Sequence, residues 1–139
     1  MITGKFPNLR LRRSRKYNWS RRLVQENNLS VNDFVLPVFL SEGKRIKQVI
    51  KTMPGVYRYS IDMLGEIVGN AIKYKIPMIA LFPSTDIQKK NQFGSEAINE
   101  DNLVCKAIRF IKKRFKNDIG IMCDVALDPY TTHGHDGLF

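Results

Sequence analysis

Three short apolar runs recur at nearly even spacing along the chain and constrain its architecture more than any other feature. They occupy residues 34–40, 78–82 and 119–127, so their starts lie a little over forty residues apart. Continuous apolar runs of this length are typical of strands buried on both faces. Helical periodicity occupies 62–75 and 99–115, between successive runs. Because strands that alternate with helices form parallel sheets with helical crossovers, we predict an α/β fold.

Both predicted helices have one apolar face. The first can take its N-cap from Ser60 or Asp62, and the second from Asn99, because these side chains accept hydrogen bonds from free backbone N–H groups of a first turn. The expected inward-facing residues are Leu64, Ile67, Val68, Ala71 and Ile72 in the first helix, and Val104, Ala107, Ile108, Ile111 and Phe115 in the second.

The connections after the first two strands are long and polar. Residues 41–59 and 84–96 are rich in turn-forming residues, so we predict loops there, and long loops after strands often carry function. Pro37 lies inside the first predicted strand. Because proline has no N–H to donate, it argues against a central position for that strand and predicts a local irregularity.

The third predicted strand becomes acidic as it ends. Side chains alternate along a strand, so Asp124 and Asp128 share one face of 119–127, and Cys123 points to the other. The loop beyond adds Tyr130, His133, His135 and Asp136. Such a group of carboxylates and imidazoles can bind a metal, move protons or hold an amine. Because sites in parallel α/β folds lie at the C-terminal ends of strands, we predict the functional site here.

Basic residues are concentrated at the start of the chain. The formal net charge is +10, and residues 1–25 contain eight Lys and Arg and no acidic residue. We therefore predict two parts, a basic N-terminal arm at 1–30 and a body at 31–139. Such an arm, with Tyr17 and Trp19, can bind nucleic acid by phosphate contacts and stacking. The favoured alternative is an arm that packs on a neighbouring subunit, so we expect no nucleic-acid partner.

Composition also argues against a membrane or secreted protein. No apolar run approaches 18 residues, and no apolar stretch follows the N-terminal arginines. Cys105 and Cys123 lack the spacing of a metal or redox motif, which favours two reduced thiols. We expect a cytoplasmic protein with no membrane partner.

Four motifs occur in the order known from one enzyme family. They are MPGVYR at 53–58, LFP at 81–83, GSEA at 94–97 followed by Asn99 and Leu103-Val104, and CDVALDPYTTHGHDG at 123–137. Through them nearly the whole chain resembles porphobilinogen synthase (delta-aminolevulinic acid dehydratase), in the variety with an aspartate-rich metal loop. The resemblance implies a TIM-type (β/α)8 barrel, of which this chain holds the arm and the first three strands.

The resemblance also implies a chemistry. The family condenses two 5-aminolevulinate molecules to porphobilinogen with loss of two waters, a hydro-lyase step of tetrapyrrole and haem biosynthesis. Asp124 matches the active-site aspartate beside the reacting amine. The two lysines that form Schiff bases come from later strands, and no lysine here lies in a matching motif. No organic cofactor is expected.

The resemblance further implies a metal site without cysteine. Ala126, Asp128 and Asp136 stand where zinc-dependent members have three cysteines. Carboxylates suit hard cations, so Asp128 and Asp136 favour Mg²⁺ over Zn²⁺, although solvated loop carboxylates are an equal alternative. His133 and His135 are candidate partners of these carboxylates, and Tyr130 belongs to the same loop.

Assembly is the third implication. Members of the family form homo-oligomers, typically octamers, in which the N-terminal arm embraces a partner subunit. Arg10, Arg12 and Arg13 are the corresponding interface candidates, and Ser95 and Glu96 are expected at an interface or in loop ordering. Lys89-Lys90-Asn91 departs from the acidic residue that usually precedes this last motif.

Length limits what the chain is expected to do alone. Chains of the family are more than twice as long, so we expect this one to be truncated, unable to close a barrel and inactive by itself. Two alternatives are a non-catalytic fragment or assembly partner of full-length subunits and, less favoured, a basic nucleic-acid-binding domain.

Overall fold

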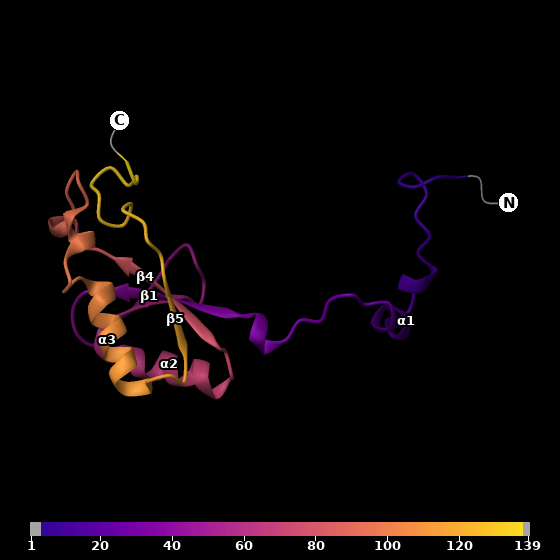
Figure 1. Ribbon diagram of the computed structural model, residues 1–139, viewed down its shortest axis with the longest axis horizontal. Helices are drawn as coiled ribbons and strands as arrows, with labels where there is room; N and C mark the ends of the chain where they lie inside the picture. Colours follow the sequence, from indigo (N-terminus) through magenta and orange to yellow (C-terminus); the bar gives the residue numbers. More distant parts are fainter. Residues whose placement is uncertain (1–3, 138–139) are drawn as a thin grey trace. The chain divides into compact units, whose positions relative to one another are not determined.

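The computed structural model describes residues 4–137 and divides between Ser30 and Val31 into two units. The first unit contains the 3-10 turn η1 (Arg13–Arg15) and the short helix α1 (Asn18–Leu23). The second unit contains the sheet and the two longer helices (Figure 1). Within the described residues, no helix is long and apolar enough to cross a membrane.

The second unit is built on one five-stranded sheet. The strands are β1 (Val35–Ser41), β2 (Lys47–Val49), β3 (Tyr57–Tyr59), β4 (Met78–Ser84) and β5 (Gly120–Cys123), in the order β2-β3-β1-β4-β5. The pairs β1–β3, β1–β4 and β4–β5 are parallel, whereas β2 is antiparallel to β3. The predicted α/β fold with parallel strands is therefore confirmed.

Two strands lie where the sequence predicts only a loop. β2 and β3 interrupt the segment 41–59, and each has only three residues. The side chains of β2 are all exposed, and β3 is only half-buried, so neither has the apolar run that identified the other strands. Their pairing depends on contacts that are distant in sequence, and the prediction of a structureless loop was wrong.

The third predicted strand is shorter than its apolar pattern. β5 pairs with β4 only as far as Leu81 opposite Cys123, and no ladder continues beyond that pair in the described chain. Val125 is fully exposed, so the apolar alternation does not correspond to burial past this point. Asp124 and Asp128 thus lie in the loop after the strand, and the expected shared strand face does not extend to them.

Pro37 lies in a strand that is central in the sheet order, against the expectation from its missing N–H. β4 pairs with β1 over the whole strand, with Pro37 opposite Ala80. β3 pairs only with Phe39 and Leu40. At Pro37, β1 is therefore paired on one side only, as in an edge strand, where proline is tolerated.

The two predicted helices are present with shifted starts. A 3-10 turn, η3 (Ile61–Met63), follows Ser60 and leads into α2 (Leu64–Lys73), whose N-cap is Met63; neither start has a side-chain cap hydrogen bond, so the predicted cap by Ser60 or Asp62 was wrong. Helix α3 runs over Leu103–Phe115, and its N-cap is Asn102, whose side chain accepts a hydrogen bond from the Cys105 N–H at 2.8 Å. The prediction of Asn99 was wrong because that side chain instead accepts from the Asp101 N–H in the preceding turn.

Helices α2 and α3 pack on one face of the sheet (Figure 1). The core between them is formed by alternate strand residues and by the apolar helix faces: Val38, Leu40, Ile79, Leu81, Leu64, Val68, Ala107 and Ile111. The opposite sheet face carries Phe39, Phe82 and Met122, and the last two are 38% and 49% exposed. Shorter 3-10 turns, η2 (Val31–Asp33), η4 (Ile87–Lys89) and η5 (Ser95–Ile98), complete the element order.

A polar network between buried Ser60 and exposed Asp62 fixes the loop after β1 against the start of η3. The hydroxyl of fully buried Ser60 accepts a hydrogen bond from the Ile46 N–H at 2.9 Å and donates to the Asp62 carboxylate at 2.6 Å. The other Asp62 oxygen accepts from the N–H of Arg45, a residue held at φ 55°. The hydrogen bonds from Ser60 and Arg45 lower the pKa of Asp62.

We expect Asp62→Asn to destabilise the fold above about pH 4 and to matter progressively less below it. The pKa of Asp62 is lower in the folded than in the unfolded protein. Its contribution to the free energy of unfolding is therefore fully present above the unfolded pKa and is lost as the pH falls through the folded pKa. Urea midpoints measured between pH 3 and 7 test this. Asp118→Asn is the control, and a wild-type-to-variant difference that does not change with pH would contradict the assignment.

Candidate functional site

The C-terminal ends of the parallel strands surround a cavity of about 350 Å³. Phe39 of β1 and Phe82 of β4 form its apolar part, with ring centroids 5.6 Å apart. The polar lining comes from several elements: Arg58 of β3, Ser84 and Thr85 at the end of β4, Lys90 after η4, and Asp128 in the loop after β5. The position agrees with the general location of sites in parallel α/β folds.

The two acidic residues predicted beside the strand end differ in their surroundings. Asp124 is exposed and follows directly after β5, whereas Asp128 is exposed and lines the cavity. The Asp128 backbone N–H donates a hydrogen bond to Asp136 Oδ1 at 3.0 Å. The structure therefore brings Asp128 and Asp136 together through the backbone of the loop, and it places Asp124 at the loop's beginning.

Asp136 closes this loop by accepting two backbone hydrogen bonds on one oxygen. Its Oδ1 atom accepts from the N–H of Leu127 at 2.5 Å and from that of Asp128. A carboxylate that accepts two backbone N–H groups is a strong local tie, because hydrogen bonds to a charged acceptor are roughly twice as strong as neutral ones. The loop from 124 to 137 is thus ordered by its own acidic residue.

The loops after β4 and β5 are joined by backbone contacts. The Asn91 N–H donates to the Tyr130 carbonyl, and the Asn91 carbonyl accepts from the Thr132 N–H. These two hydrogen bonds make an isolated parallel bridge between Asn91 and Thr131. Gly94 lies close to Thr131 and has a left-handed backbone conformation, with φ 63°. A Cβ atom at this position would lie 3.3 Å from the Thr131 methyl group. Glycine at 94 therefore permits both this backbone conformation and the contact.

The histidines bond to backbone rather than to the carboxylates. His133 Nε2 lies 3.2 Å from the Gln92 carbonyl, and His133 Nδ1 accepts from the His135 N–H at 3.3 Å. The two rings stack with centroids 6.0 Å apart. Among the hydrogen bonds of residues 4–137, none joins either histidine ring to Asp124, Asp128 or Asp136. In this arrangement His133 helps to hold the two loops together, whereas the contacts of His135 lie within its own loop.

Ser95 and Glu96 belong to a polar network within the loop after β4. The Asn91 side chain bonds to the Ser95 hydroxyl and also accepts from the Ser95 N–H. Glu96 accepts from the Asn99 side chain at 3.0 Å and lies 4.0 Å from the Lys89 ammonium. Lys89 also pairs with Glu42, just after β1, at 2.5 Å, and this hydrogen bond raises the pKa of Lys89.

Burial perturbs two groups beneath the loops. Tyr130 is 8% exposed, and burial raises the pKa of its phenol. Burial also raises the pKa of the Cys123 thiol, which favours its neutral form. Tyr130 contributes its backbone to the loop contacts, since its N–H donates to the Leu127 carbonyl.

The donor chemistry of the loop fits a hard cation better than zinc. Asp128 and Asp136 offer carboxylate oxygens, which suit Mg²⁺, but they meet only through the Asp128 N–H, and their side chains line different cavities. Among residues 4–137, no three His, Cys, Asp or Glu side chains gather as a ready metal-binding group. A cation bound by either carboxylate would therefore take most of its ligands from water.

Arg58 and Lys90 are cavity residues to which the sequence analysis assigned no role. Arg58 lies inside the MPGVYR motif, but the strand that directs it into the cavity was not predicted. Lys90 lies in a Lys-Lys-Asn run that resembles ordinary solvated charge. The only sequence feature that could have indicated a site at Lys90 was the position of this basic run beside the GSEA motif.

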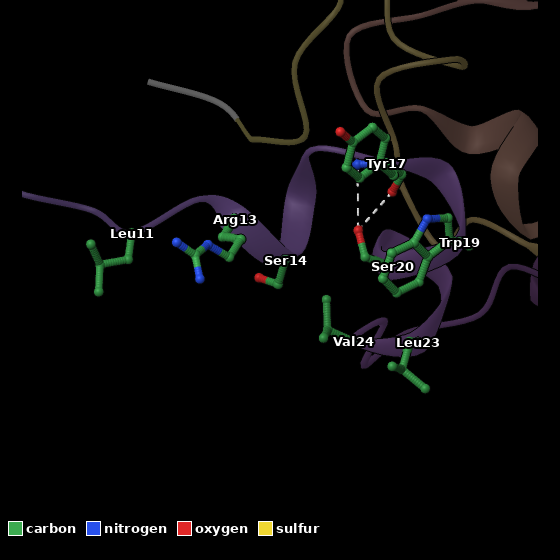
Figure 2. Close-up of a pocket in the computed structure, with 8 residues that line it drawn as sticks. All are labelled: Leu11, Arg13, Ser14, Tyr17, Trp19, Ser20, Leu23 and Val24. Carbon is green, nitrogen blue, oxygen red and sulfur yellow. Dashed lines mark hydrogen bonds between the residues drawn. The ribbon is translucent and has the colours of Figure 1, made fainter.

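The first unit has its own apolar pocket of about 590 Å³ (Figure 2). The rings of Tyr17 and Trp19 lie nearly parallel with centroids 6.2 Å apart. The Ser20 hydroxyl fixes the first turn of α1 by donating to the Tyr17 carbonyl at 2.9 Å. Apolar residues exposed around the pocket include Leu11, Trp19 and Leu23, at 76%, 63% and 79%.

The arginines expected at an interface lie in the same unit. Arg10 stacks over the Phe6 ring at 5.4 Å, and Arg13 lines the pocket. Arg12 is exposed and precedes η1. Basic and apolar side chains are thus exposed together on this first unit.

Comparisons with known proteins match this chain over nearly its whole length. The family model described as delta-aminolevulinic acid dehydratase matches residues 8–139. Delta-aminolevulinic acid dehydratase of Bradyrhizobium diazoefficiens is 52% identical over 130 residues, and that of Chlamydia pneumoniae is 40% identical; each match covers 94% of this chain and 36% or 39% of the relative. The chain therefore spans little more than a third of the length of these relatives.

A solved structure is similar in fold as well as in sequence. It is delta-aminolevulinic acid dehydratase (porphobilinogen synthase) from Toxoplasma gondii in complex with the reaction product porphobilinogen. The match has a TM-score of 0.83 at 38% identity, and it covers 94% of this chain and 36% of that one.

We expect Asp136→Ala to loosen the loop after β5 without unfolding the sheet. The N–H groups of Leu127 and Asp128 lose their acceptor, so their hydrogen exchange should accelerate by about tenfold or more, as for a lost charge-assisted hydrogen bond. Amide exchange followed by NMR measures this. Asp136→Asn keeps a carbonyl acceptor and should show a smaller change; equal protection in all three proteins would contradict the tie.

Proposed function

This chain belongs to the delta-aminolevulinic acid dehydratase family, and from that membership we propose that it supplies the N-terminal part of a porphobilinogen synthase. The reaction condenses two 5-aminolevulinate molecules and releases two waters, a lyase step of tetrapyrrole and haem biosynthesis. The observation that carries the proposal is the fold match, at 38% identity over 94% of this chain, to a structure that holds porphobilinogen. Cytoplasmic location is part of the same proposal.

Asp124 is the proposed catalytic residue of this chain. Its carboxylate is exposed directly after β5, at the strand end that borders the cavity loops. A carboxylate there can orient the amine of a bound substrate and accept a proton from it. The fixed end of β5 supports this role, since positioning on a rigid strand end maintains the alignment that proton transfer requires.

We propose that the sheet is part of a TIM-type barrel. The face opposite α2 and α3 carries Phe39, Phe82 and Met122, which would fill the interior of a closed barrel. Parallel strands with helices on one face are the geometry that such a barrel requires. The remaining strands, and the lysines that form Schiff bases in the family, would come from outside residues 1–139.

Asp128 and Asp136 are the residues proposed to hold a divalent cation, Mg²⁺ rather than Zn²⁺. When bound, such an ion would supply positive charge that polarises an oxygen of the substrate. Asp136 has a second function here, because its Oδ1 atom also orders the backbone at Asp128. His133 and His135 would support this loop through their backbone contacts.

The N-terminal unit is proposed to join copies of the chain into a homo-oligomer. Leu11, Trp19 and Leu23 are largely exposed around one pocket, and such an apolar surface is typical of an interaction site (Figure 2). Arg10, Arg12 and Arg13 would add contacts to carboxylates of a neighbouring copy.

A chimera tests the proposed reaction. Residues 1–139 replace the matching segment of the Bradyrhizobium diazoefficiens relative, and porphobilinogen formed from 5-aminolevulinate is measured with and without added Mg²⁺. We expect activity in the chimera and a loss of at least about 100-fold on Asp124→Asn, in the range for a lost proton-transfer group. Asp118→Asn, an exposed aspartate at the other end of β5, is the matched control and should retain activity.

Two outcomes would count against this function. A folded chimera without turnover would argue that the segment is non-catalytic, and equal activity in the Asp124 and Asp118 variants would remove Asp124 from the reaction. The 139-residue chain alone should form no porphobilinogen, because no lysine in it lies in a motif matching the Schiff-base positions.

Assembly is tested separately through Trp19. We expect Trp19→Ala to weaken self-association of the chimera by about 2 kcal/mol or more, because exposed aromatic residues commonly dominate interface energies. Sedimentation velocity across a concentration series measures it. Tyr74→Ala, which removes a comparably exposed aromatic side chain from the other unit, is the control; unchanged association in the Trp19 variant would contradict the interface.

A further inference from the structure

Three consecutive residues, 89–91, connect the loops that surround the cavity. Lys89 ends η4, and its ammonium pairs with the carboxylate of Glu42, just after β1, at 2.5 Å. Lys90 lines the cavity. Asn91 makes the backbone bridge to the loop after β5. A contact at either end of this tripeptide therefore constrains where Lys90 lies.

The ion pair of Lys89 begins where the backbone connection between β1 and β4 stops. Ser41 opposite Ser84 is the last pair of that ladder, and Glu42 is the next residue along the chain. The side chains of Lys89 and Glu42 are 39% and 37% exposed, so water weakens their attraction without removing it. The pair thus extends the alignment of the two strands into the loops that follow them.

Glu96 gives the Lys89 ammonium a second acidic neighbour. Its Oε1 atom lies 4.0 Å from the nitrogen, and its side chain is only 14% exposed. Glu96 is itself fixed by the Asn99 side chain, which donates a hydrogen bond to it at 3.0 Å. The hydrogen bond to Glu42 and the charge of Glu96 raise the pKa of Lys89, so the ammonium stays charged at neutral pH. Two different segments therefore hold this one cation.

The turn η4 transmits the position of Lys89 to the cavity. The Asp86 side chain accepts from the Gln88 N–H at 3.0 Å, and the Asp86 carbonyl accepts from the Lys89 N–H at 2.9 Å. The Lys90 N–H donates to the Ile87 carbonyl at 3.2 Å. Because one short turn fixes the backbone of both lysines, a displacement of this turn moves Lys90 with it.

We propose that the Lys89–Glu42 ion pair positions the segment 89–91, so that Lys90 stays in the cavity lining and Asn91 stays bridged to the loop after β5. Lys89 is not one of the described residues that line the cavity. It therefore acts through its two neighbours and is a positioning residue. The effect on turnover rests on the proposed function, whereas the ordering of the loops does not.

Amide hydrogen exchange of the 139-residue chain tests the ordering. We expect Lys89→Gln to accelerate exchange at the Asn91 and Thr132 N–H groups by about threefold, in the range for an ion pair that is partly exposed. The Leu81 amide of β4 should be unchanged. Lys89→Arg keeps the charge and should restore most of the protection. Lys113→Gln, on the exposed side of α3, is the matched control and should exchange like the wild type.

Two exchange results would overturn the proposal. Wild-type protection of both loop amides in Lys89→Gln would show that the ion pair orders neither loop. Equal acceleration at Leu81 would show a general loss of stability rather than a local effect.

A double-mutant cycle in the chimera assigns the effect on turnover to the pair. Lys89→Gln and Glu42→Gln should each lower kcat by about threefold, because small misplacements of groups around a site slow a reaction. The double variant should be no slower than either single variant, since the same contact is lost only once. A loss of about ninefold, the product expected for independent effects, would refute the pair.

The division between kcat and KM separates positioning from binding. Because neither Lys89 nor Glu42 is among the described residues that line the cavity, KM for 5-aminolevulinate should stay within about twofold in each variant. A raised KM with unchanged kcat would show that Lys89 acts on ligand binding, and it would overturn the positioning role.

Failure of the proposed function and failure of this inference give different results. An inactive chimera, together with faster exchange at Asn91 in Lys89→Gln, would overturn the proposed reaction and support the ordering of the loops. An active chimera in which Lys89→Gln changes neither exchange nor kcat would overturn this inference alone.

Discussion

The parallel pairing of β1 with β4 is the constraint on which the rest of the second unit depends. It is the longest ladder in the described chain, from Val35 opposite Met78 to Ser41 opposite Ser84. This register aligns Leu40 with the core face and stacks Phe39 on Phe82 across the other. It also makes both strands end at the same level. The loops that follow therefore emerge side by side, and Lys89 after β4 pairs with Glu42 after β1.

Where the loops after β4 and β5 meet, the polar groups serve two purposes. Asn91, Thr131 and His133 connect the loops mainly through backbone atoms. Arg58, Lys90 and Asp128 instead direct charge into the cavity. Using backbone contacts for order leaves these charged side chains available for a ligand. This division between backbone and side-chain roles explains how a loop with so many exposed polar residues can be ordered while its charged side chains remain free to bind.

The sequence predicted the parts of the fold that depend on continuous burial. The runs that became β1, β4 and β5 are apolar, and the helical faces of α2 and α3 match the core. The sequence did not predict β2 and β3, because their side chains are polar or aromatic. These segments are strands only because β3 pairs with β1 and β2 pairs with β3. The same limit applies at the site: Asp124 could be placed at a strand end, whereas the cavity position of Arg58 requires the unpredicted β3.

The two backbone hydrogen bonds that Asp136 accepts have a consequence for any exchange of this residue. In the resemblance noted from the sequence, this position is cysteine in zinc-dependent enzymes. A sulfur atom is a weak hydrogen-bond acceptor, so a cysteine at 136 would leave the Leu127 and Asp128 N–H groups poorly satisfied. Replacing this aspartate by cysteine is therefore a change of backbone support as well as of side-chain chemistry.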